Sequence, residues 1–510
     1  MNRELWEDWL NYDARADLKA FQTVPTAKWL EMGEQRALET FRTAAERVSA
    51  YREFLADRGI HPERVRTMDD FRQLPLTDKS SYFGTYSLSE VALDGTLHGA
   101  ATIHTGSGSS GGLSYWPKSA PQDINSYKGV ELLYVGHFDV DVKPTLFINC
   151  LAMGTWPAGE IMHAACKAMG DKGLPISVIS PGLDADRFLA ILVDLGKAFE
   201  QVIVGAYPSF LRNLVDAGLQ QGVDFRRFNM KVLTGGERFS EEWRRYVTAK
   251  LGLEDPRRDI ASCLGISEIG IIGFTTPLTE FLRMYLYDDS ELGCRLFGDG
   301  PLPTLIQYVP PARYAEMVDG EIIVTCGGTI PIVRYNTMDI GALTTPGELL
   351  AAVPDSFVES YDALNEPYGI PNLPVLAVQG RADALTLLAV NIYHNQLCFA
   401  LEAPELSQYV TGRFMAEEIE TEEARGHLRL WVELRPSVDR QQDIRDQVQR
   451  QIAQGIAKMN DQYAAALNAL GEDVFPLVEL VQHSSGAFPL PSGKGSAIRR
   501  RLSNQPGGTS

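Results

Sequence analysis

Apolar and polar positions follow two different periods along the chain, one helical and one strand-like. Over residues 26–58, apolar side chains recur near helical spacing among many charges, which predicts helix. From residue 98 to 345, short apolar runs alternate with helical segments, and the clearest runs cover residues 145–151, 175–180, 201–206 and 231–236. Ser240 stands where it would cap the helix that follows the last run. This alternation predicts an α/β domain built on a mainly parallel sheet.

The C-terminal stretch has a different pattern. Residues 427–434 alternate like a half-exposed strand, apolar residues between 444 and 459 share one helical face, and residues 476–483 read as a further strand. A unit of roughly 120 residues is large enough to form a separate domain. We therefore expect a large α/β domain over residues 1–380 and a small, mobile α+β domain over residues 381–510.

The composition is that of an ordinary globular protein, with 45% hydrophobic and 22% charged residues among 510. A formal net charge of −19 argues against nucleic acid or an anionic membrane as the main partner, because both select basic surfaces. The six cysteines form no CxxC pair, the eight histidines show no metal-ligand spacing, and the acidic N-terminus is no secretory signal. No apolar run has the length of about 18 residues that a membrane span needs. These features predict a cytoplasmic protein without membrane segments.

Residues 104–116 read HTGSGSSGGLSYW, and GSGSSG within them matches the dinucleotide-binding pattern G-x-G-x-x-G. A dinucleotide fold needs a helix that starts at the last glycines, whereas two prolines follow here, and no acidic residue ends a second strand over residues 126–140. No GK[ST] closes the loop, which excludes a Walker A motif. A phosphate-binding loop and a flexible surface linker remain as interpretations. The position between a strand and an α/β core favours the phosphate loop.

Seven segments, in order, resemble segments of the adenylate-forming ligases, and within that family its phenylacetate–CoA ligase-like branch. They are the lead-in over residues 50–82, which contains LPLTDK, and then TGSGSSGGL (105–113), TGGERFSEEWR (234–244), LGISEIG (264–270), IPIVRYNTMDIG (330–341), GRADALTLLAVNIY (380–393) and LPSGKGSAIRR (490–500). The resemblance implies a large adenylate-forming domain with a small lid domain. It also implies a first step in which a carboxylate attacks the α-phosphate of ATP, giving an acyl-adenylate and pyrophosphate, with Mg²⁺ as cofactor and CoA as the usual acceptor.

The resemblance assigns roles to residues of the large domain. The phosphate loop would hold ATP through Thr105, Ser107, Gly108, Ser109, Ser110 and Gly111. The adenine would lie against Gly235, Gly236 and Glu237, and Gly265 and Ser267 belong to the same ATP-binding set. The glycines also suit a simple strand-to-helix turn. Glu268 would be the Mg²⁺ ligand and a catalytic residue, and its alternative is a helix-capping glutamate.

Three further residues complete the nucleotide site that the resemblance implies. Asp339 would accept both ribose hydroxyls, and its alternative is a turn aspartate. Arg381 would contact the ribose or a phosphate at the hinge, and its alternative is a surface residue at the domain boundary. Lys494, between two glycines of the small domain, would reach the α-phosphate and the carboxylate when that domain closes, and its alternative is a surface lysine.

The acyl pocket should be lined by parts of residues 149–160 and 204–210 and by the stretch after Glu268. Within these segments, Trp156, Tyr207 and Phe274 would enclose a flat aromatic acid. Each of them is equally suited to be a core aromatic residue. The preference for an aromatic acid therefore comes from the branch that the chain resembles, and not from these residues.

The phosphate loop and the adenine site depart from the family pattern. Gly112 and Leu113 stand where the family usually has Lys-Pro, so a cation expected near the terminal phosphates is missing. Lys118 is six residues further on and is a candidate replacement. Leu264 replaces the tyrosine that usually stacks on adenine. These changes predict a lower affinity for ATP or a rearranged pocket.

The hinge segment departs as well. Ala384 replaces the second aspartate of the family, and the Arg-Gly pair is shortened to Ala389. In the relatives this strip rotates the small domain and then shapes the channel for the thiol. The changes therefore bear on the CoA step more than on adenylation.

These observations predict an ATP- and Mg²⁺-dependent, AMP-forming ligase that delivers an aromatic or other small carboxylic acid to CoA. A first alternative keeps adenylation but uses another acceptor, as in amide or nitrogen–nitrogen bond formation in specialised metabolism, with activation of nitrite included. A second alternative is a non-catalytic nucleotide-binding homologue. We expect ATP and a small acid as the partners, no nucleic acid and no membrane; a homodimer is left open.

Overall fold

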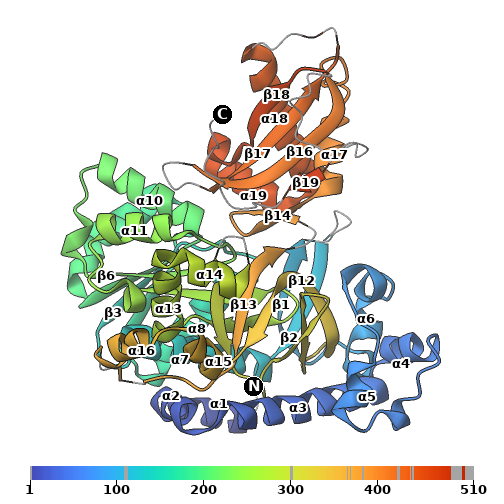
Figure 1. Ribbon diagram of the computed structural model, residues 1–510, viewed down its shortest axis with the longest axis vertical. Coiled ribbons are helices and arrows are strands. Elements are labelled where there is room, and N and C mark those ends of the chain that lie inside the picture. The colour runs from blue at the N-terminus through green and yellow to red at the C-terminus, as the bar shows by residue number, and fades with distance from the viewer. Residues whose placement is uncertain are drawn as a thin grey trace.

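The structure is a computed structural model, and it describes residues 3–107, 113–298, 302–364, 366, 367, 369–381, 384–421, 426–436, 438, 442–483 and 497–499. A large lower part and a small upper part are visible along its long axis (Figure 1). The large part holds the elements up to β13, and the small part holds the elements that follow β13. Among the described residues, no helix is both long and apolar enough to cross a bilayer.

Helices make up the N-terminal stretch, and the first of them lie along the lower edge of the molecule (Figure 1). They are α1 (Arg3–Leu10), α2 (Ala14–Thr23), α3 (Thr26–Arg47), α4 (Ser49–Ala56), α5 (Met68–Arg72) and α6 (Leu88–Val91). The helical prediction for residues 26–58 is confirmed, with one break at Val48, whose extended backbone separates α3 from α4. Five small or aromatic residues of α3 are buried at intervals of about one turn, which fixes the face that packs inward.

An 11-stranded sheet forms the centre of the large part, in the order β10-β11-β12-β13-β9-β8-β7-β6-β5-β3-β4. Its parallel half contains the strands β3 (Thr145–Asn149), β4 (Ile176–Ile179), β5 (Gln201–Gly205), β6 (Met230–Gly235) and β7 (Ile260–Ile266). The helices between and before them are α7 (Ala120–Phe138), α8 (Pro157–Lys172), α9 (Ala185–Leu195), α10 (Pro208–Gln220), α11 (Glu241–Leu251) and α12 (Pro256–Asp259). The four predicted strands are confirmed, and Ser240 caps α11 by accepting the Trp243 N–H at 3.0 Å.

The other half of the sheet is antiparallel. Its strands are β8 (Gly270–Phe274), β9 (Thr304–Tyr308), β10 (Tyr314–Val318), β11 (Glu321–Cys326), β12 (Ile332–Thr344) and β13 (Val375–Arg381). The helices α13 (Pro277–Asp288), α14 (Ser290–Phe297), α15 (Pro346–Ala352) and α16 (Asp355–Asp362) accompany them. The α/β class is confirmed, and the parallel arrangement holds for β3 to β7. The direction of the chain changes at the turn between β7 and β8.

A separate hairpin carries the glycine loop. The strands β1 (Ala100–Ser107) and β2 (Leu113–Ser119) pair antiparallel and form a two-stranded sheet of their own. The loop residues Gly108, Ser109, Ser110, Gly111 and Gly112 lie outside the described residues. A strand follows the loop and α7 starts only at Ala120, which agrees with the exclusion of a dinucleotide-binding turn.

The small part begins with a hairpin of β14 (Ala384–Leu387) and β15 (Val390–Tyr393), which we call the hinge hairpin. A four-stranded sheet follows in the order β18-β17-β16-β19, with β16 (Val410–Glu420), β17 (Gly426–Leu434), β18 (Leu477–Val481) and β19 (Ala497–Arg499). Its helices are α17 (His394–Leu401), α18 (Gln442–Met459) and α19 (Asp461–Leu470). β13, the last strand of the large sheet in the chain, ends at Arg381, next to the predicted domain boundary.

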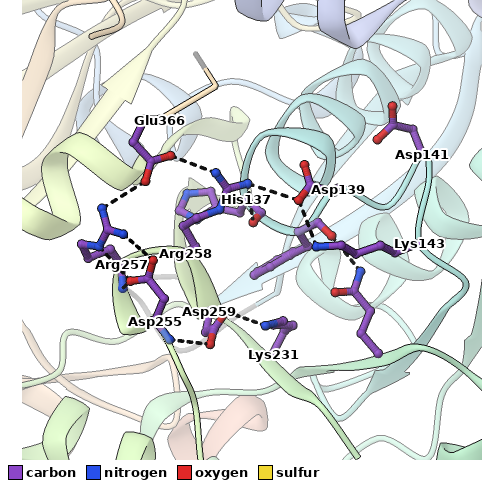
Figure 2. A network of polar contacts seen from close by, with 12 residues as sticks. His137, Asp139, Asp141, Lys143, Lys231, Asp255, Arg257, Arg258, Asp259 and Glu366 are labelled. Atoms are coloured by element: carbon purple, nitrogen blue, oxygen red, sulfur yellow. Dashed lines mark hydrogen bonds and ion pairs between the residues drawn. The ribbon is translucent and has the colours of Figure 1, made fainter. Parts of the chain in front are cut away.

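A network of charges ties the amino ends of the parallel strands together (Figure 2). Glu366 accepts hydrogen bonds from Arg257 at 3.0 Å and from Arg258 at 2.9 Å. Lys231 of β6 pairs with Asp259, which directly precedes β7, at 2.6 Å. Because ligands of parallel sheets bind at the carboxyl ends of the strands, this network lies at the edge of the sheet away from the expected site.

Candidate active site

Three side chains from distant segments meet at the turn between β7 and β8. Glu268 lies in this turn and is only 6% exposed. Its Oε1 atom is 2.6 Å from the Lys79 ammonium and accepts a hydrogen bond from the Tyr335 hydroxyl at 3.0 Å. The helix-capping alternative for Glu268 is wrong, because an antiparallel strand and not a helix follows it.

The charge on Glu268 is stabilised in spite of its burial. Burial alone would raise the pKa of this carboxyl, but the Lys79 charge and the hydrogen bonds from Lys79 and Tyr335 outweigh it and hold the pKa below its usual value. Burial would likewise lower the pKa of Lys79, and the Glu268 charge instead raises it. The pair is therefore ionised at neutral pH, and the Tyr335 hydroxyl, whose burial raises its pKa, stays protonated.

A short parallel contact brings Lys79 to this place. The Thr77 N–H donates to the Arg334 carbonyl at 3.0 Å, and the Asn336 N–H donates to the Thr77 carbonyl at 2.8 Å. Asp78 then accepts the N–H groups of Ser80 and Ser81 at 2.7 Å each, which starts the helical turn Lys79–Phe83. Lys79 and Tyr335 were missed as site residues, although the LPLTDK and RYNTM segments that contain them were recognised.

Lys118 lies behind Glu268 and supports its backbone. It is 6% exposed, and its ammonium donates to the Glu268 carbonyl oxygen at 2.5 Å. Burial lowers the pKa of Lys118 to about 8, with the nearby Arg313 charge acting in the same direction. Lys118 therefore contacts the backbone of residue 268, whereas Lys79 pairs with the Glu268 carboxylate.

Asp339 and Arg381 face each other across β12 and β13, where they are register partners. The Arg381 Nη1 atom is 3.9 Å from the Asp339 Oδ1 atom, and Asp339 is 7% exposed. Met338, directly before it, has a left-handed backbone with φ of 61° and donates its N–H to the Asn336 side chain at 2.8 Å. The turn alternative for Asp339 is wrong, because the residue lies within β12.

The segment Gly235–Glu237 connects β6 to α11, as the strand-to-helix alternative predicted. Gly236 has φ of 76°, and a Cβ atom on it would lie 2.4 Å from the Cβ of Ala389 in the hinge hairpin. Glu237 accepts hydrogen bonds from the Ser209 N–H at 3.0 Å, from the Ser209 hydroxyl at 2.8 Å and from the Ala389 N–H at 3.3 Å. This segment thus contacts both α10 and the hinge hairpin.

The hairpin of the phosphate loop ends on the Ser267–Glu268 turn. A Cβ atom on Gly106 would approach the Ser267 Cβ to 3.1 Å. Thr105 is 4% exposed, and both its N–H and its hydroxyl bond to Thr155, at 3.0 and 2.8 Å. Of the predicted loop residues, Ser107 is described only by its backbone, and the four that follow lie outside the described residues. Gly265 lies in β7, close to the Gly270 carbonyl.

The three aromatic residues predicted for the acyl pocket have different surroundings. Tyr207 precedes α10, is 5% exposed, and its hydroxyl accepts the Ala152 N–H at 3.4 Å, which brings it to the predicted pocket segment 149–160. Trp156 precedes α8 and is half-buried. Phe274 lies at the end of β8 and belongs, with Tyr207, to the main apolar core. A pocket for an aromatic acid stays a prediction.

Lys494, the predicted catalytic lysine, lies outside the described residues. The hinge hairpin that leads to the small part nevertheless reaches the site. Tyr393, at the end of β15, is 6% exposed and acts electrostatically on both Lys79 and Tyr335. The site is therefore bordered by the phosphate hairpin, the β7–β8 turn, β12 and the hinge hairpin.

No protein-family model matches the chain. The chain is 22% identical to the phenylacetate-coenzyme A ligase of Thermus thermophilus over 395 residues, which are 76% of this chain and 78% of that ligase. It is 21% identical to the phenylacetate-coenzyme A ligase of Escherichia coli over 329 residues, 64% of this chain and 70% of that ligase.

Among solved structures, a 2-hydroxyisobutyryl-CoA ligase in complex with 2-HIB-AMP and CoA in the thioesterification state is similar, with a TM-score of 0.67 and 17% identity over 97% of this chain and 95% of that chain. The same ligase in its postadenylation state with R3-HIB-AMP gives a TM-score of 0.55 and 16% identity over 96% and 94% of the chains. The fold as a whole is thus shared, and its overall arrangement is nearer to the thioesterification structure.

Proposed function

Since the chain belongs to the phenylacetate–CoA ligase-like branch of the adenylate-forming superfamily, we propose that it is an AMP-forming ligase that joins a small carboxylic acid to CoA. In the first step the acid's carboxylate attacks the α-phosphate of ATP and displaces pyrophosphate. In the second step the CoA thiol attacks the acyl carbon of the adenylate and displaces AMP. Both steps need cationic or hydrogen-bonding groups where phosphate charge develops.

The observation that carries this proposal is the buried Lys79–Glu268 pair beneath the phosphate hairpin. Phosphoryl and nucleotidyl transfer depend on charges that are fixed before the reaction. Lys79 supplies a fixed cation of this kind, held within 2.6 Å of the Glu268 carboxylate. The resemblance puts Gly112 where the family has lysine, and in this proposal Lys79 would supply a cation near the phosphates from another segment.

Glu268 fits the role of a Mg²⁺ ligand. Mg²⁺ usually keeps several waters and binds one or two carboxylates together with substrate phosphates. The described residues contain no cluster of three or more side chains that could hold a metal ion, so in this proposal the ion would take its remaining ligands from water and the phosphates. The bound ion would neutralise phosphate oxygens, while Lys79 and Tyr335 hold the Glu268 carboxylate in its ionised form.

The other nucleotide contacts follow from the same arrangement. Asp339 would accept the ribose hydroxyls, and Arg381, its register partner, would reach the ribose or a phosphate. Gly235, Gly236 and Glu237 would lie along the adenine. The division at residue 380 lets the small domain move about the hinge and bring Lys494 to the α-phosphate in the first step. The greater similarity to the thioesterification structure supports an arrangement in which that step is complete.

We propose an aromatic acid as the substrate, enclosed by Trp156, Tyr207 and Phe274. The contact between Tyr207 and Ala152 supports this site, because it joins the two segments expected to line the pocket. The 2-hydroxyisobutyryl-CoA ligase named above acts on a small branched hydroxy acid, so the test includes such acids.

A different acceptor is the second candidate, and the hinge hairpin favours it. Its turn consists of Leu388 and Ala389, the arginine–glycine pair of the family being shortened to Ala389, and Ala389 packs directly against Gly236. An amine would then accept the activated acyl group. In a further variant, an oxyanion such as nitrite would be activated by ATP in place of a carboxylate. A non-catalytic nucleotide-binding protein is disfavoured, because it would not need a buried, ionised Lys79–Glu268 pair.

The test is an incubation with ATP, Mg²⁺ and a panel of phenylacetate, benzoate, 2-hydroxyisobutyrate and acetate, each with and without CoA. Mass spectrometry follows AMP and acyl-CoA. Glu268→Gln and Lys494→Ala are measured beside Lys458→Ala, an exposed lysine of the small part. AMP and acyl-CoA that appear together and are lost in the first two variants alone support the proposal. AMP release that does not depend on CoA would indicate another acceptor. No AMP release with any acid would contradict the proposed function.

A further inference from the structure

The hinge hairpin turns through two residues in an unfavourable backbone conformation. Leu388 has φ of 52° and Ala389 has φ of 59°, in the left-handed region that side chains with a Cβ atom disfavour. Such a turn persists only where surrounding contacts hold it. The contacts around the hinge hairpin therefore indicate which residues hold this turn in place, and with it the small part that follows in the chain.

One group of these contacts comes from a short segment of the large part, residues 237–240, which we call the docking strip. Glu237 accepts the N–H of Ala389 in the turn at 3.3 Å. The next residue, Arg238, lies over the hinge itself, since a Cβ atom on Gly380 would be 3.2 Å from its guanidinium. The docking strip thus touches the chain on both sides of the predicted domain boundary.

Two glutamates of the small part reach the same strip. Glu418 of β16 accepts the N–H of Thr386 in the hinge hairpin at 2.5 Å and lies 3.5 Å from the Arg238 guanidinium. Glu420, two residues further on the same face of β16, accepts the Ser240 hydroxyl at 2.5 Å. Glu417, directly before Glu418, points to the other face, where it pairs with Arg429 inside the small part at 3.8 Å.

We propose that Glu418 and Glu420 are positioning residues that latch the small part onto the docking strip and so hold the arrangement in which the acyl group is transferred. The Ser240–Glu420 contact is a charge-assisted hydrogen bond, one of the stronger polar contacts, and the Arg238–Glu418 ion pair at 3.5 Å adds to it from the same strand. In the proposed function, adenylation brings Lys494 to the site with the small part in a different position, so it would not need the latch. The expected effects on reaction rates rest on the proposed function, whereas the expected position of the small part does not.

The test compares Glu418→Ala and Glu420→Ala with Glu417→Ala, the matched control from the same strand. Pyrophosphate exchange into ATP measures adenylation, and acyl-CoA formation measures transfer. We expect each latch variant to lower transfer about tenfold, the factor that the loss of one strong hydrogen bond produces, with exchange changed less than about twofold. Glu417→Ala should leave both rates unchanged.

A structural measurement separates the latch from the proposed reaction. Small-angle X-ray scattering of the full chain without ligands should give a larger radius of gyration for the Glu418→Ala, Glu420→Ala double variant than for the wild type and Glu417→Ala. If no acid supports exchange in the wild type, the proposed function fails and scattering alone decides on the latch. Equal scattering profiles, or exchange and transfer that fall in parallel, would overturn the latch.

Discussion

Lys79 and Glu268 form an ion pair 2.6 Å long in which the carboxylate is almost fully buried. An isolated charge of either sign would be unfavourable at this depth, so each residue sets the protonation state of the other. The pair places one fixed negative and one fixed positive charge at the β7–β8 turn, against which the β1–β2 hairpin packs. Removing either residue should therefore affect chemistry and stability together.

Lys79→Met should lower adenylation strongly. The variant removes the cation and leaves Glu268 buried without its partner, so we expect the rate of pyrophosphate exchange to fall by about 10²–10³. Lys79→Arg keeps the charge and should retain more activity. Steady-state kinetics with varied ATP check this, and similar rates for Lys79→Met and the wild type would remove Lys79 from the site.

Stability should rise with pH on the alkaline side because of Lys118. Its pKa is about 8 in the folded protein, below the usual lysine value, so the unfolded chain binds more protons between the two values. The free energy of unfolding should therefore increase by about 2 kcal/mol from pH 7.5 to 9.5 through this group. Urea unfolding of the wild type and Lys118→Met at both pH values tests the effect, which the variant should lack.

Acid should remove the stability that the Glu268–Lys79 pair contributes. The pKa of Glu268 is lowered in the folded protein, so its contribution to stability is present above the unfolded value of about 4.3 and is lost as the pH falls through the folded value. Thermal unfolding between pH 3 and pH 6 should show a steeper loss in the wild type than in Glu268→Gln. Parallel curves for the two proteins would contradict the assigned shift.

Asp339→Asn should weaken nucleotide binding without unfolding the protein. The substitution keeps the shape of the side chain but removes the charged acceptor expected to hold both ribose hydroxyls, and we expect the Kd for ATP to rise about tenfold or more. Isothermal titration calorimetry gives the affinity. Asp355→Asn, at an exposed position in α16, is the control and should bind ATP like the wild type.

The charge network of Figure 2 should matter for stability alone. The Glu366 side chain is 6% exposed and accepts from both Arg257 and Arg258, so Glu366→Ala leaves two guanidinium groups without their shared partner. We expect a loss of about 3 kcal/mol in the free energy of unfolding. The affinity for ATP should stay constant, because the network lies at the opposite edge of the sheet, and a large change in affinity would contradict that separation.

The α/β class and the individual elements were predictable because buried strands and amphipathic helices have characteristic periods. The antiparallel half of the sheet was not, since β8 and β9 are apolar runs like β3 and β5, and strand direction depends on the connection. β7 and β8 are joined by a short turn, which allows only an antiparallel pair. A three-residue connection between two apolar runs is the signal that would have shown it.

The candidate site was partly predictable for a similar reason. Glu268 and Asp339 stand in segments that resemble motifs of the family, so both could be named as candidate site residues from the sequence. Lys79 did not stand out, because a lysine in a polar connector looks like a surface residue until its partner is known. Its partner lies far away in the sequence, and only the contact between Thr77 and β12 brings the two together. The left-handed turn at Leu388 and Ala389 was equally hidden, because neither residue type favours it.

The contact of Thr77 with Arg334 and Asn336 also sets an order of events during synthesis. The ribosome releases Lys79 early and Glu268 later, but the strand that holds the Lys79 segment in place appears only when β12 has been made. Until then the distance between the two charges is not fixed, because the Lys79 segment has no strand to pair with. A nascent chain that ends after β8 would carry both the lysine and the glutamate and would still have no site.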